Sequence, residues 1–472
     1  MLAPRFNTRE SERARAEPLE LSLYSRDAGL ANGQAGAVCF PRDASDVAFA
    51  VATCKKLGVP FVARGSGTGL AGGATPLDDA LVIVTTQMNR VISIDAASRT
   101  AWVEPGLLNL DLTRAAQPYG LHYAPDPSSQ QACSIGGNVA TNAGGPHCLS
   151  SGSTTAHVLA VEAVLPNGEV AMLGSTAPDQ PGFDLRGIFV GSEGMLGIAT
   201  KVLVKLVPNP PQIQTMLLDF MSIDEAAATV SAIIAAGIMP AALEMMDSRI
   251  TAAVEDFVGA GYPRDAAAVL LVEVDGLSGG VDHQASLITE IGRAHGAREV
   301  RLARSESERQ LLWKGRKSAF GAIARIAPDY YLHDAVVPRS KLVGVLRTIY
   351  EIADSHDLTM MNVFHAGDGN LHPLIVFDRR VIGVWERVQA AGTEILERCL
   401  AAGGVLSGEH GIGLEKRAMM AQFFSEADLE LQARVADALD PHGLANPGKV
   451  LPAGFRCGEV GINRTLPEGT WI

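Results

Sequence analysis

The chain has 472 residues, of which 47% are hydrophobic and 19% charged, and its formal net charge is −13. This length exceeds one ordinary core, so we expect two or more domains in a folded, soluble protein. The acidic balance argues against a nucleic-acid or anionic-membrane surface. Apolar runs are far shorter than the roughly 20 residues that span a bilayer. Because no apolar block follows the charged N-terminus, the sequence predicts no secretory signal and a cytoplasmic protein.

The first half of the sequence alternates between helix and strand signals. The stretch "DVAFAVATCKKLGVPFVARG" at 46–65 predicts a helix and then a strand. Three short β-rich runs and a return to helix follow, at 80–86, 91–95, 100–106 and 110–120. This alternation indicates an α/β or α+β domain.

The second half begins after the proline-rich segment "VPNPPQ" at 207–212, our expected domain boundary. Ser222 and Gly237 predict the N-cap and C-cap of the first helix beyond it. A strand and two helices are expected next, and then a recurring strand–helix unit, at 267–276, 279–297, 305–326 and 340–405. The C-terminal tail is expected to return to the first domain.

The cysteines bear on redox and metal chemistry. Six are scattered along the chain, at positions 39, 54, 133, 148, 399 and 457, and no two form a C-x-x-C motif. This spacing excludes a self-contained iron–sulfur or cysteine-rich zinc site in this chain. We expect them to be small buried hydrophobic residues.

A glycine-rich loop, "VARGSGTGLAGGATP" at 62–76, is the strongest feature of the first half. Its glycines allow positive φ and close approach of backbone N–H groups to a ligand, which suits a diphosphate. The formal G-x-G-x-x-G does not predict a Rossmann fold, because no helix opens there and no acid follows about twenty residues on. The Lys-Ser/Thr of a Walker loop is also absent. A purely structural cluster of turns is the alternative.

Two further tracts rich in small and polar residues follow, at 125–149 and 191–200. The first has many Ser, Thr, Asn and Gly residues and almost no charge. Such hydroxyl and amide groups suit a polar, uncharged heterocycle with a ribityl-like chain better than they suit nucleic acid.

Together, the three tracts resemble those of FAD-linked oxidases of the vanillyl-alcohol oxidase and para-cresol methylhydroxylase family. Within it, the chain is most similar to glycolate oxidase flavin subunits and to D-lactate and D-2-hydroxyglutarate dehydrogenases. The resemblance implies an α+β fold: a two-subdomain FAD-binding domain (1–208, completed by the tail 445–472) and an α+β substrate (cap) domain with an antiparallel sheet (209–444). It also implies non-covalently bound FAD, contacted by Arg64, Gly65, Ser66, Gly67, Thr68, Gly69, Asp126, Ser134, Gly137, Asn138, Thr141, Asn142, Gly144, Glu193, Gly194, Ile198 and Asn446. His147 and His157 are not expected to bind flavin covalently.

Two histidines flank a turn in "NVFHAGDGNLHPLIVF" at 362–377. If Asp368 and Gly369 form a two-residue type I′ turn, His365 pairs directly with His372. Directly opposed residues have Cβ atoms roughly 4.5–5.5 Å apart, and two imidazoles there can share a metal ion. Two separately hydrogen-bonded histidines are the alternative.

The partner of this histidine pair is expected in "GGVLSGEHGIGLEKR" at 403–417. Glu409 would complete a two-His, one-carboxylate set that leaves positions open for substrate. In the hydroxyacid dehydrogenases that the chain resembles, "HAGDGNxH" and "GEHG" have these roles. The resemblance implies that His365, His372 and Glu409 bind a divalent metal, with zinc preferred over manganese or iron, and that His410 is the catalytic base.

Other pocket residues are expected from the same resemblance. Arg316 matches an arginine that binds the substrate carboxylate, although a solvated helix charge is the alternative. Tyr330 and Tyr331 match residues that line the pocket. The dicarboxylate-oxidising relatives have an Asn where Pro373 stands here and a lysine that this chain lacks near 332–338. A small monocarboxylate is therefore the expected substrate.

The predicted function is FAD-dependent oxidation of a small D-2-hydroxyacid, glycolate or D-lactate, to the 2-oxoacid. The alternatives are a D-2-hydroxyglutarate-type dehydrogenase, a metal-dependent hydrolase, and a flavoprotein scaffold without activity. Without iron–sulfur ligands of its own, the chain is expected to pass electrons to a separate subunit, a quinone-linked carrier or oxygen. The resemblance to glycolate oxidase flavin subunits, which work with an iron–sulfur partner, implies a similar partner subunit, which could also bring the chain to a membrane.

Overall fold

The structure is a computed structural model that describes residues 14–177 and 181–455. The chain divides into two compact units: residues 1–144, 152–209 and 409–472 form the first, and residues 145–151 and 210–408 the second. The chain thus returns to the first unit at Glu409, whereas the sequence analysis expected it to return at residue 445. The charged N-terminal stretch 1–13, the end of the tail from 456 and Cys457 lie outside the described residues.

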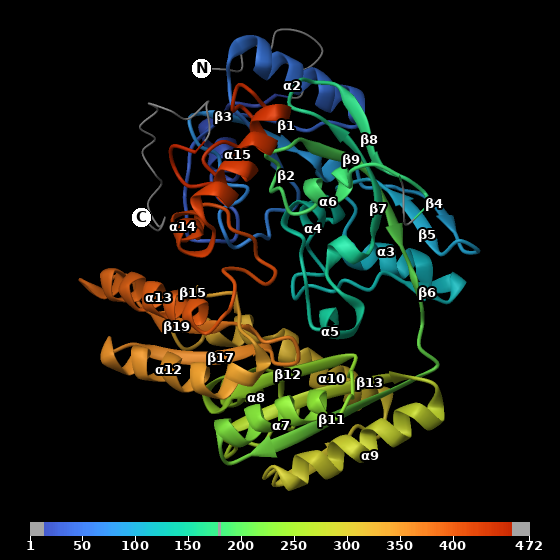
Figure 1. Ribbon diagram of the computed structural model, residues 1–472, viewed down its shortest axis with the longest axis vertical. Helices are drawn as coiled ribbons and strands as arrows, with labels where there is room; N and C mark the ends of the chain where they lie inside the picture. Colours follow the sequence, from blue (N-terminus) through green and yellow to red (C-terminus); the bar gives the residue numbers. More distant parts are fainter. Residues whose placement is uncertain (1–13, 178–180, 456–472) are drawn as a thin grey trace. The chain divides into compact units, whose positions relative to one another are not determined.

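The first unit contains a three-stranded parallel sheet in the order β1-β3-β2 (Figure 1). Helix α2 packs on it through Val47, Val51 and Cys54, which share a buried core with residues of the sheet. The carboxylate of Asp43 caps α2 by accepting the N–H groups of Ser45 and Asp46. The helix and two strands expected at 46–65 and 80–86 are confirmed as α2 (Ala44–Leu57), β2 (Phe61–Arg64) and β3 (Ala80–Val84), whereas β1 (Ala35–Cys39) was not predicted.

A five-stranded antiparallel sheet in the order β4-β5-β9-β7-β8 forms the rest of this unit's framework. The strands and helix expected at 91–95, 100–106 and 110–120 are confirmed. The elements are α1 (Pro18–Ser22), β4 (Val91–Asp95), β5 (Thr100–Val103), α3 (Asn109–Ala116), β6 (Leu121–His122), α4 (Ile135–Thr141), β7 (Val158–Val164), β8 (Val170–Gly174), α6 (Leu185–Phe189), β9 (Ile198–Lys205) and β10 (Val207–Pro208).

The C-terminal part of the chain completes the first unit. After α14 (Met420–Phe423) and α15 (Glu426–Leu439), Ala445 bridges in parallel to Phe61 at the start of β2 and is fully buried. The ammonium of Lys449 is also buried and donates to the carbonyl of Thr75, 2.7 Å away. These contacts join the chain end to the parallel sheet and the glycine-rich loop.

The second unit is built on one nine-stranded antiparallel sheet with the main strand order β14-β11-β13-β12-β17-β18-β16. Strand β19 pairs with both β15 and β17 and continues the hairpin that contains His365. The strands are β11 (Gln212–Phe220), β12 (Ala242–Asp247), β13 (Ala268–Gly276), β14 (Glu299–Leu302), β15 (Asp329–Leu332), β16 (Ala335–Val336), β17 (Thr359–His365), β18 (Asn370–Leu371) and β19 (Pro373–Phe377).

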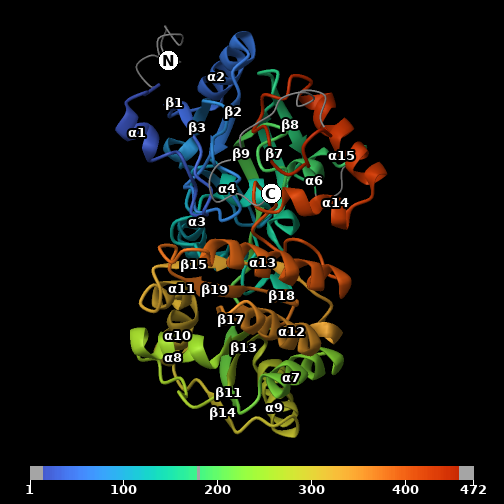
Figure 2. The same cartoon turned by 90° about the vertical axis from the view of Figure 1, so that its left-hand side faces the viewer.

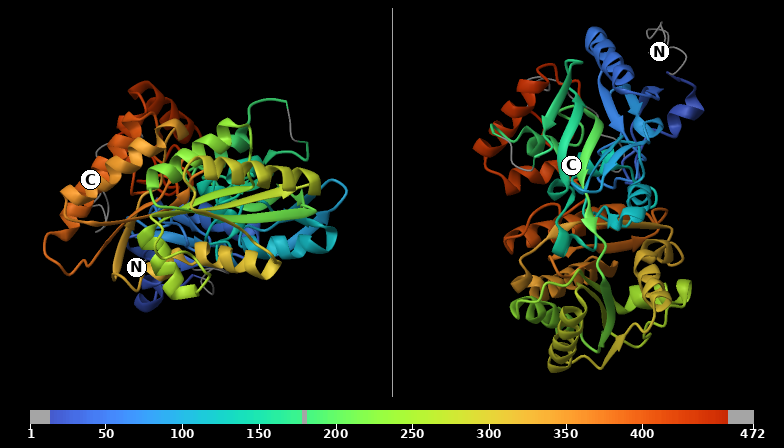
Figure 3. Two further views of the ribbon diagram at one scale, coloured as in Figure 1. Left: turned by 90° about the horizontal axis from the view of Figure 1, so that it is seen from below. Right: turned by 90° about the vertical axis from the view of Figure 1, so that its right-hand side faces the viewer.

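Helices cover both faces of this sheet, which explains why β12 is buried along its whole length (Figure 3). Helices α7 and α9 pack on β11 and β13, and α8 packs on β12, β13 and β17. Helices α12 and α13 pack against each other (Figure 2). The helices are α5 (Cys148–Ser151), α7 (Ile223–Ala235), α8 (Ser248–Val258), α9 (Ser278–Ala294), α10 (Glu306–Lys317), α11 (Ala319–Ile323), α12 (Leu342–Ser355) and α13 (Val384–Ala401).

Local signals for these helices were largely correct. Ser222 caps α7, as expected, whereas Ala236 is the C-cap and Gly237, at φ +78°, is the residue after it. The single helix expected at 305–326 breaks at Ser318 into α10 and α11. Within the described residues, no helix is both long enough and apolar enough to cross a membrane.

Candidate active site

The glycine-rich loop of the first unit begins at Arg64, the last residue of β2, and approaches the start of α4 closely. A Cβ on Gly65 would lie 2.1 Å from the hydroxyl oxygen of Ser134, so a side chain at this position would force Ser134 to move. Gly67 has φ +74°, a conformation that also favours glycine. The structure thus brings the tract at 64–69 together with the tract at 125–144.

Helix α4 arranges the polar residues of the second tract. Ser134 is its N-cap and accepts the N–H of Gly137, and Asn142 ends it at φ +51°. Asn138 is buried and accepts a hydrogen bond from the amide of Asn109, 3.0 Å away. The hydroxyl of Thr141 donates to the carbonyl of Gly137. Most of these side chains therefore hold the helix and its caps, while the backbone of the tract stays close to the glycine-rich loop.

Glu193, in the third tract, is buried and holds a loop from the C-terminal part of the chain. Its carboxylate accepts the N–H groups of Ile412 (2.7 Å) and Gly413 (2.9 Å). Burial raises the pKa of Glu193 to about 7, although these N–H groups oppose the shift. The amide of Asn446 donates to the carbonyl oxygens of Glu193 and Gly73. The third tract, the glycine-rich loop and the chain end are thus connected.

The remaining residues predicted to contact FAD lie in the same three tracts of the first unit. Asp126 is buried in the segment before α4, Gly194 has φ +79°, and Ile198 is the buried first residue of β9. Ser66, Thr68, Gly69 and Gly144 lie in loops of the two tracts that Gly65 and Ser134 bring together.

In the second unit, the hairpin containing the two histidines differs from the one expected. His365 pairs with Asn370 and not with His372, so the loop between them has four residues, 366–369. A type I′ turn needs positive φ at both central residues, and of Asp368 and Gly369 only Gly369 has it. The predicted register was therefore wrong. His372 nevertheless lies diagonally across from His365, with ring centroids 5.1 Å apart.

A buried glutamate lies directly behind His365. Glu244 of β12 is the register partner of His365, and its Oε1 is 2.7 Å from His365 Nδ1. Its Oε2 lies 2.5 Å from a guanidinium nitrogen of Arg316 on α10. Burial raises the pKa of Glu244, but Arg316 and His365 outweigh it and hold the pKa below its usual value. Arg316, predicted to bind substrate, is thus 1% exposed and paired with a protein carboxylate.

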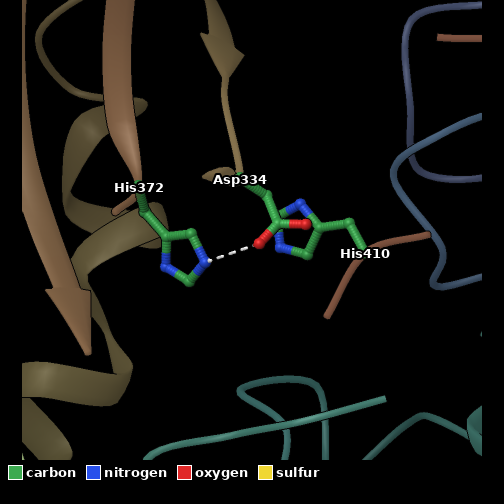
Figure 4. Close-up of side chains that lie close together, drawn as sticks. All are labelled: Asp334, His372 and His410. Carbon is green, nitrogen blue, oxygen red and sulfur yellow. Dashed lines mark ion pairs between the residues drawn. The ribbon is translucent and has the colours of Figure 1, made fainter. Parts of the chain in front are cut away.

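Asp334 is a second buried carboxylate that the sequence reasoning missed. It accepts the hydroxyl of Ser407 (2.6 Å) and the N–H of Gly408 (3.0 Å), and lies 3.6 Å from His372 Nε2 (Figure 4). These bonds hold the chain immediately before Glu409. An acid within a mostly apolar run, as in "YYLHDAVV" and "AALEMM", was the signal that could have identified Asp334 and Glu244.

Glu409 and His410 follow directly after Gly408, whose N–H group Asp334 accepts. Asp334, His365 and His372 belong to the second unit, whereas Glu409 and His410 belong to the first. A pair of imidazoles with a carboxylate is a donor set that fits a divalent transition metal.

The two tyrosines predicted to line the pocket do not share a face. Tyr330 and Tyr331 are consecutive residues of β15, so their side chains point to opposite sides of the sheet. The ring of Tyr331 is buried and packs edge-on against His333, with centroids 4.5 Å apart. At most one of the two can face a substrate.

Comparison with known proteins identifies the family. Residues 35–174 match the model of the FAD binding domain, and residues 209–450 match that of the C-terminal domain of FAD linked oxidases. The chain is 48% identical to glycolate oxidase subunit GlcD of Escherichia coli (strain K12), over 90% of this chain and 85% of that one. The chain belongs to the FAD-linked oxidases. It is 32% identical to a D-lactate dehydrogenase of Anaerostipes hadrus, over 86% of this chain and 87% of that one.

Among solved structures, p-cresol methylhydroxylase has the same fold, with a TM-score of 0.80, 16% sequence identity, and coverage of 95% of this chain and 96% of that one. The predicted vanillyl-alcohol oxidase-type fold is confirmed. This FAD-linked oxidase is an oxidoreductase with FAD as its cofactor, so the hydrolase alternative is wrong. The glycine-rich loop is compatible with FAD because its glycines leave backbone N–H groups uncovered by side chains.

Proposed function

We propose that this FAD-linked oxidase oxidises a small D-2-hydroxyacid, glycolate or D-lactate, to the corresponding 2-oxoacid. The observation that carries the proposal is the pair of buried histidines on one hairpin, His365 and His372, whose ring centroids lie 5.1 Å apart. Relatives that are named for glycolate and D-lactate oxidation support the substrate class.

The proposed roles follow from the chemistry of each side chain. His365, His372 and Glu409 hold a divalent metal, with zinc preferred, and His410 takes the proton of the substrate hydroxyl on an imidazole nitrogen. When bound, the metal lowers the pKa of that hydroxyl and non-covalent FAD accepts the hydride. A guanidinium has five N–H donors, so Arg316 can bind Glu244 and a substrate carboxylate together.

FAD is proposed to bind the first unit. The loop 64–69 would hold its diphosphate, and the tracts at 125–144 and 193–198 would hold its isoalloxazine and adenine ends. The close approach of Gly65 to Ser134 supports this placement, because it leaves the backbone of both tracts accessible to one ligand.

A monocarboxylate is favoured over 2-hydroxyglutarate. The residue after His372 is Pro373, which cannot donate a hydrogen bond from either backbone or side chain. Its carbonyl is already engaged, since it accepts the N–H of His333. The lysine that dicarboxylate-oxidising relatives offer near 332–338 is absent as well.

The anaerobic visible spectrum of the purified protein tests this function. We expect glycolate or D-lactate to bleach the flavin absorbance, and L-lactate and D-2-hydroxyglutarate to leave it unchanged. Bleaching by D-2-hydroxyglutarate alone would replace the proposed substrate with the dicarboxylate. A flavin that none of the four acids reduces would refute the proposal.

A further inference from the structure

The contacts of Glu244 connect two groups that the proposed function uses separately. Glu244 and His365 are opposite residues of the antiparallel strands β12 and β17, and Oε1 lies 2.7 Å from Nδ1. The second oxygen, Oε2, lies 2.5 Å from a nitrogen of Arg316. All three residues are at most 3% exposed. One buried carboxylate thus contacts both an expected metal ligand and an arginine from α10.

The chemistry of imidazole determines what the contact with Nδ1 does. A carboxylate only accepts hydrogen bonds, so Nδ1 of His365 must be the nitrogen that carries the proton. Nε2 is then the nitrogen with a lone pair to offer a metal ion. Because the hydrogen bond also fixes the direction of the ring, it sets both the tautomer and the orientation of the ligand.

We propose that Glu244 is a positioning residue for the metal site: it holds His365 in the Nδ1–H tautomer with Nε2 directed at the metal, and Arg316 is its counter-charge. This inference rests on the proposed function, in which His365 binds the metal. It assigns a role to a residue that neither the sequence motifs nor the resemblance pointed to.

The competing explanation is that Glu244 serves only to neutralise Arg316. A buried arginine without an anionic partner is strongly destabilising, so Glu244→Ala alone would not separate the two explanations. The double substitution Glu244→Met/Arg316→Met does separate them. It removes both charges together, so no buried charge is left uncompensated, but the carboxylate acceptor for His365 is lost.

The matched control is Asp247, a second buried carboxylate three residues further along the same strand. It accepts the N–H groups of Ile250 and Asn362 and the hydroxyl of Tyr350, 2.8 Å away. These partners include neither His365 nor Arg316. Asp247→Asn therefore removes a buried carboxylate from β12 without touching the expected ligand.

The test measures the affinity of the FAD-loaded protein for zinc by competition with a chromophoric chelator, with flavin content as the check of folding. We expect the double variant to bind zinc about 10- to 100-fold more weakly than the wild type. Asp247→Asn should bind zinc like the wild type. Wild-type affinity in the double variant would overturn the inference, because Glu244 would then serve only Arg316. A wild-type protein that binds no divalent metal would instead refute the metal part of the proposed function.

A second measurement needs no folded Glu244 variant. In metal-free protein with ¹⁵N-labelled histidine, the tautomer of His365 is read from its ring-nitrogen chemical shifts, assigned by their loss in His365→Gln. We expect the Nδ1–H form. An Nε2–H form in the wild-type protein would overturn the inference even if the variants failed to fold.

Discussion

Several buried carboxylates accept hydrogen bonds from residues in or next to the proposed site. Glu193, Glu244 and Asp334 are each at most 5% exposed, and each accepts hydrogen bonds from residues at least seventy positions away. A fourth, Glu273, accepts the indole N–H of Trp313 at 2.6 Å. Because a buried charge without partners is costly, each carboxylate fixes the groups around it. They hold the loop at 411–413, His365 and the segment before Glu409, which are the parts of the proposed site.

The different roles proposed for His410 and His365 predict different effects of their alanine variants on metal content and flavin reduction. His410→Ala should keep FAD and metal, but should reduce flavin about 10²- to 10⁴-fold more slowly, because a general base is lost. His365→Ala should lose bound metal as well as activity. Elemental analysis and stopped-flow flavin reduction measure both effects. Unchanged metal content in His365→Ala would contradict the ligand assignment.

The raised pKa of Glu193 predicts that the stability of the folded protein depends on pH. Its pKa is raised from 4.5 to about 7 in the folded protein, so the native state binds this proton more tightly than the unfolded chain does. Its contribution to stability is complete below pH 4.5 and is lost as the pH rises towards 7. The loss is at most about 3 kcal/mol, from 1.36 kcal/mol per pKa unit.

The measurement is thermal unfolding of FAD-free wild type and Glu193→Gln between pH 5 and pH 8. Over that range we expect Tm of the wild type to fall relative to that of the variant, since other titrating groups cancel in the comparison. A constant difference between the two proteins would contradict the prediction.

At the scale of elements, the β17–β19 hairpin shows which local signals were reliable. The sequence correctly predicted a hairpin with glycine at its turn, because Asp-Gly between apolar runs is a strong local signal. It did not predict the register, because that depends on contacts outside the hairpin. The N–H of Val337 donates to the carbonyl of Gly369, and the N–H of Gly367 donates to the carbonyl of Leu243. These bonds favour the four-residue loop over the two-residue turn.

Two glycine-to-alanine variants, one in this hairpin and one in α12, should change the free energy of unfolding in opposite directions. In Gly369→Ala, the new Cβ would lie 2.2 Å from the carbonyl oxygen of Val337 at a residue with φ +79°. We expect the free energy of unfolding to fall by at least about 1–3 kcal/mol. Metal binding should also weaken, because the loop between the two histidines must shift. Gly344→Ala is the control, since no atom lies within 4 Å of its Cβ in α12. It should be neutral or stabilising by about 0.5–1 kcal/mol.

Urea unfolding monitored by circular dichroism gives both free energies of unfolding. Equal stabilities for the two variants would show that the backbone of the hairpin loop is not constrained as described.

At the scale of the whole molecule, the chain crosses between its two units more often than the sequence indicated. Besides the return at Glu409, the short segment 145–151 belongs to the second unit. Within that unit, His147 Nε2 lies 3.3 Å from a carboxylate oxygen of Glu273, and the hydroxyl of Ser150 donates to the carbonyl of Ala241. The polar tract at 125–149 therefore contributes residues to both units.

The cysteine pattern leads to a prediction about electron transfer. Five cysteines lie in the described residues, and four of these are buried. Because the relative from Escherichia coli is named as a subunit of glycolate oxidase, we propose that electrons leave reduced FAD to a separate iron–sulfur subunit. The isolated chain should then turn over much faster with an artificial dye acceptor than with oxygen. Rapid reoxidation of the reduced flavin in air would remove the reason for such a partner.

The sequence by itself determined the local elements, the three cofactor tracts and the motifs containing His365, His372, Glu409 and His410. Helix caps, glycine positions and apolar periodicity act within a few residues, so they can be read along the chain. Only the tertiary structure decided that Arg316 pairs with Glu244, that Asp334 holds Ser407 and Gly408, and that His365 faces Asn370 across the hairpin. Those contacts depend on strand register and on helices packed across the sheet, which no local pattern specifies.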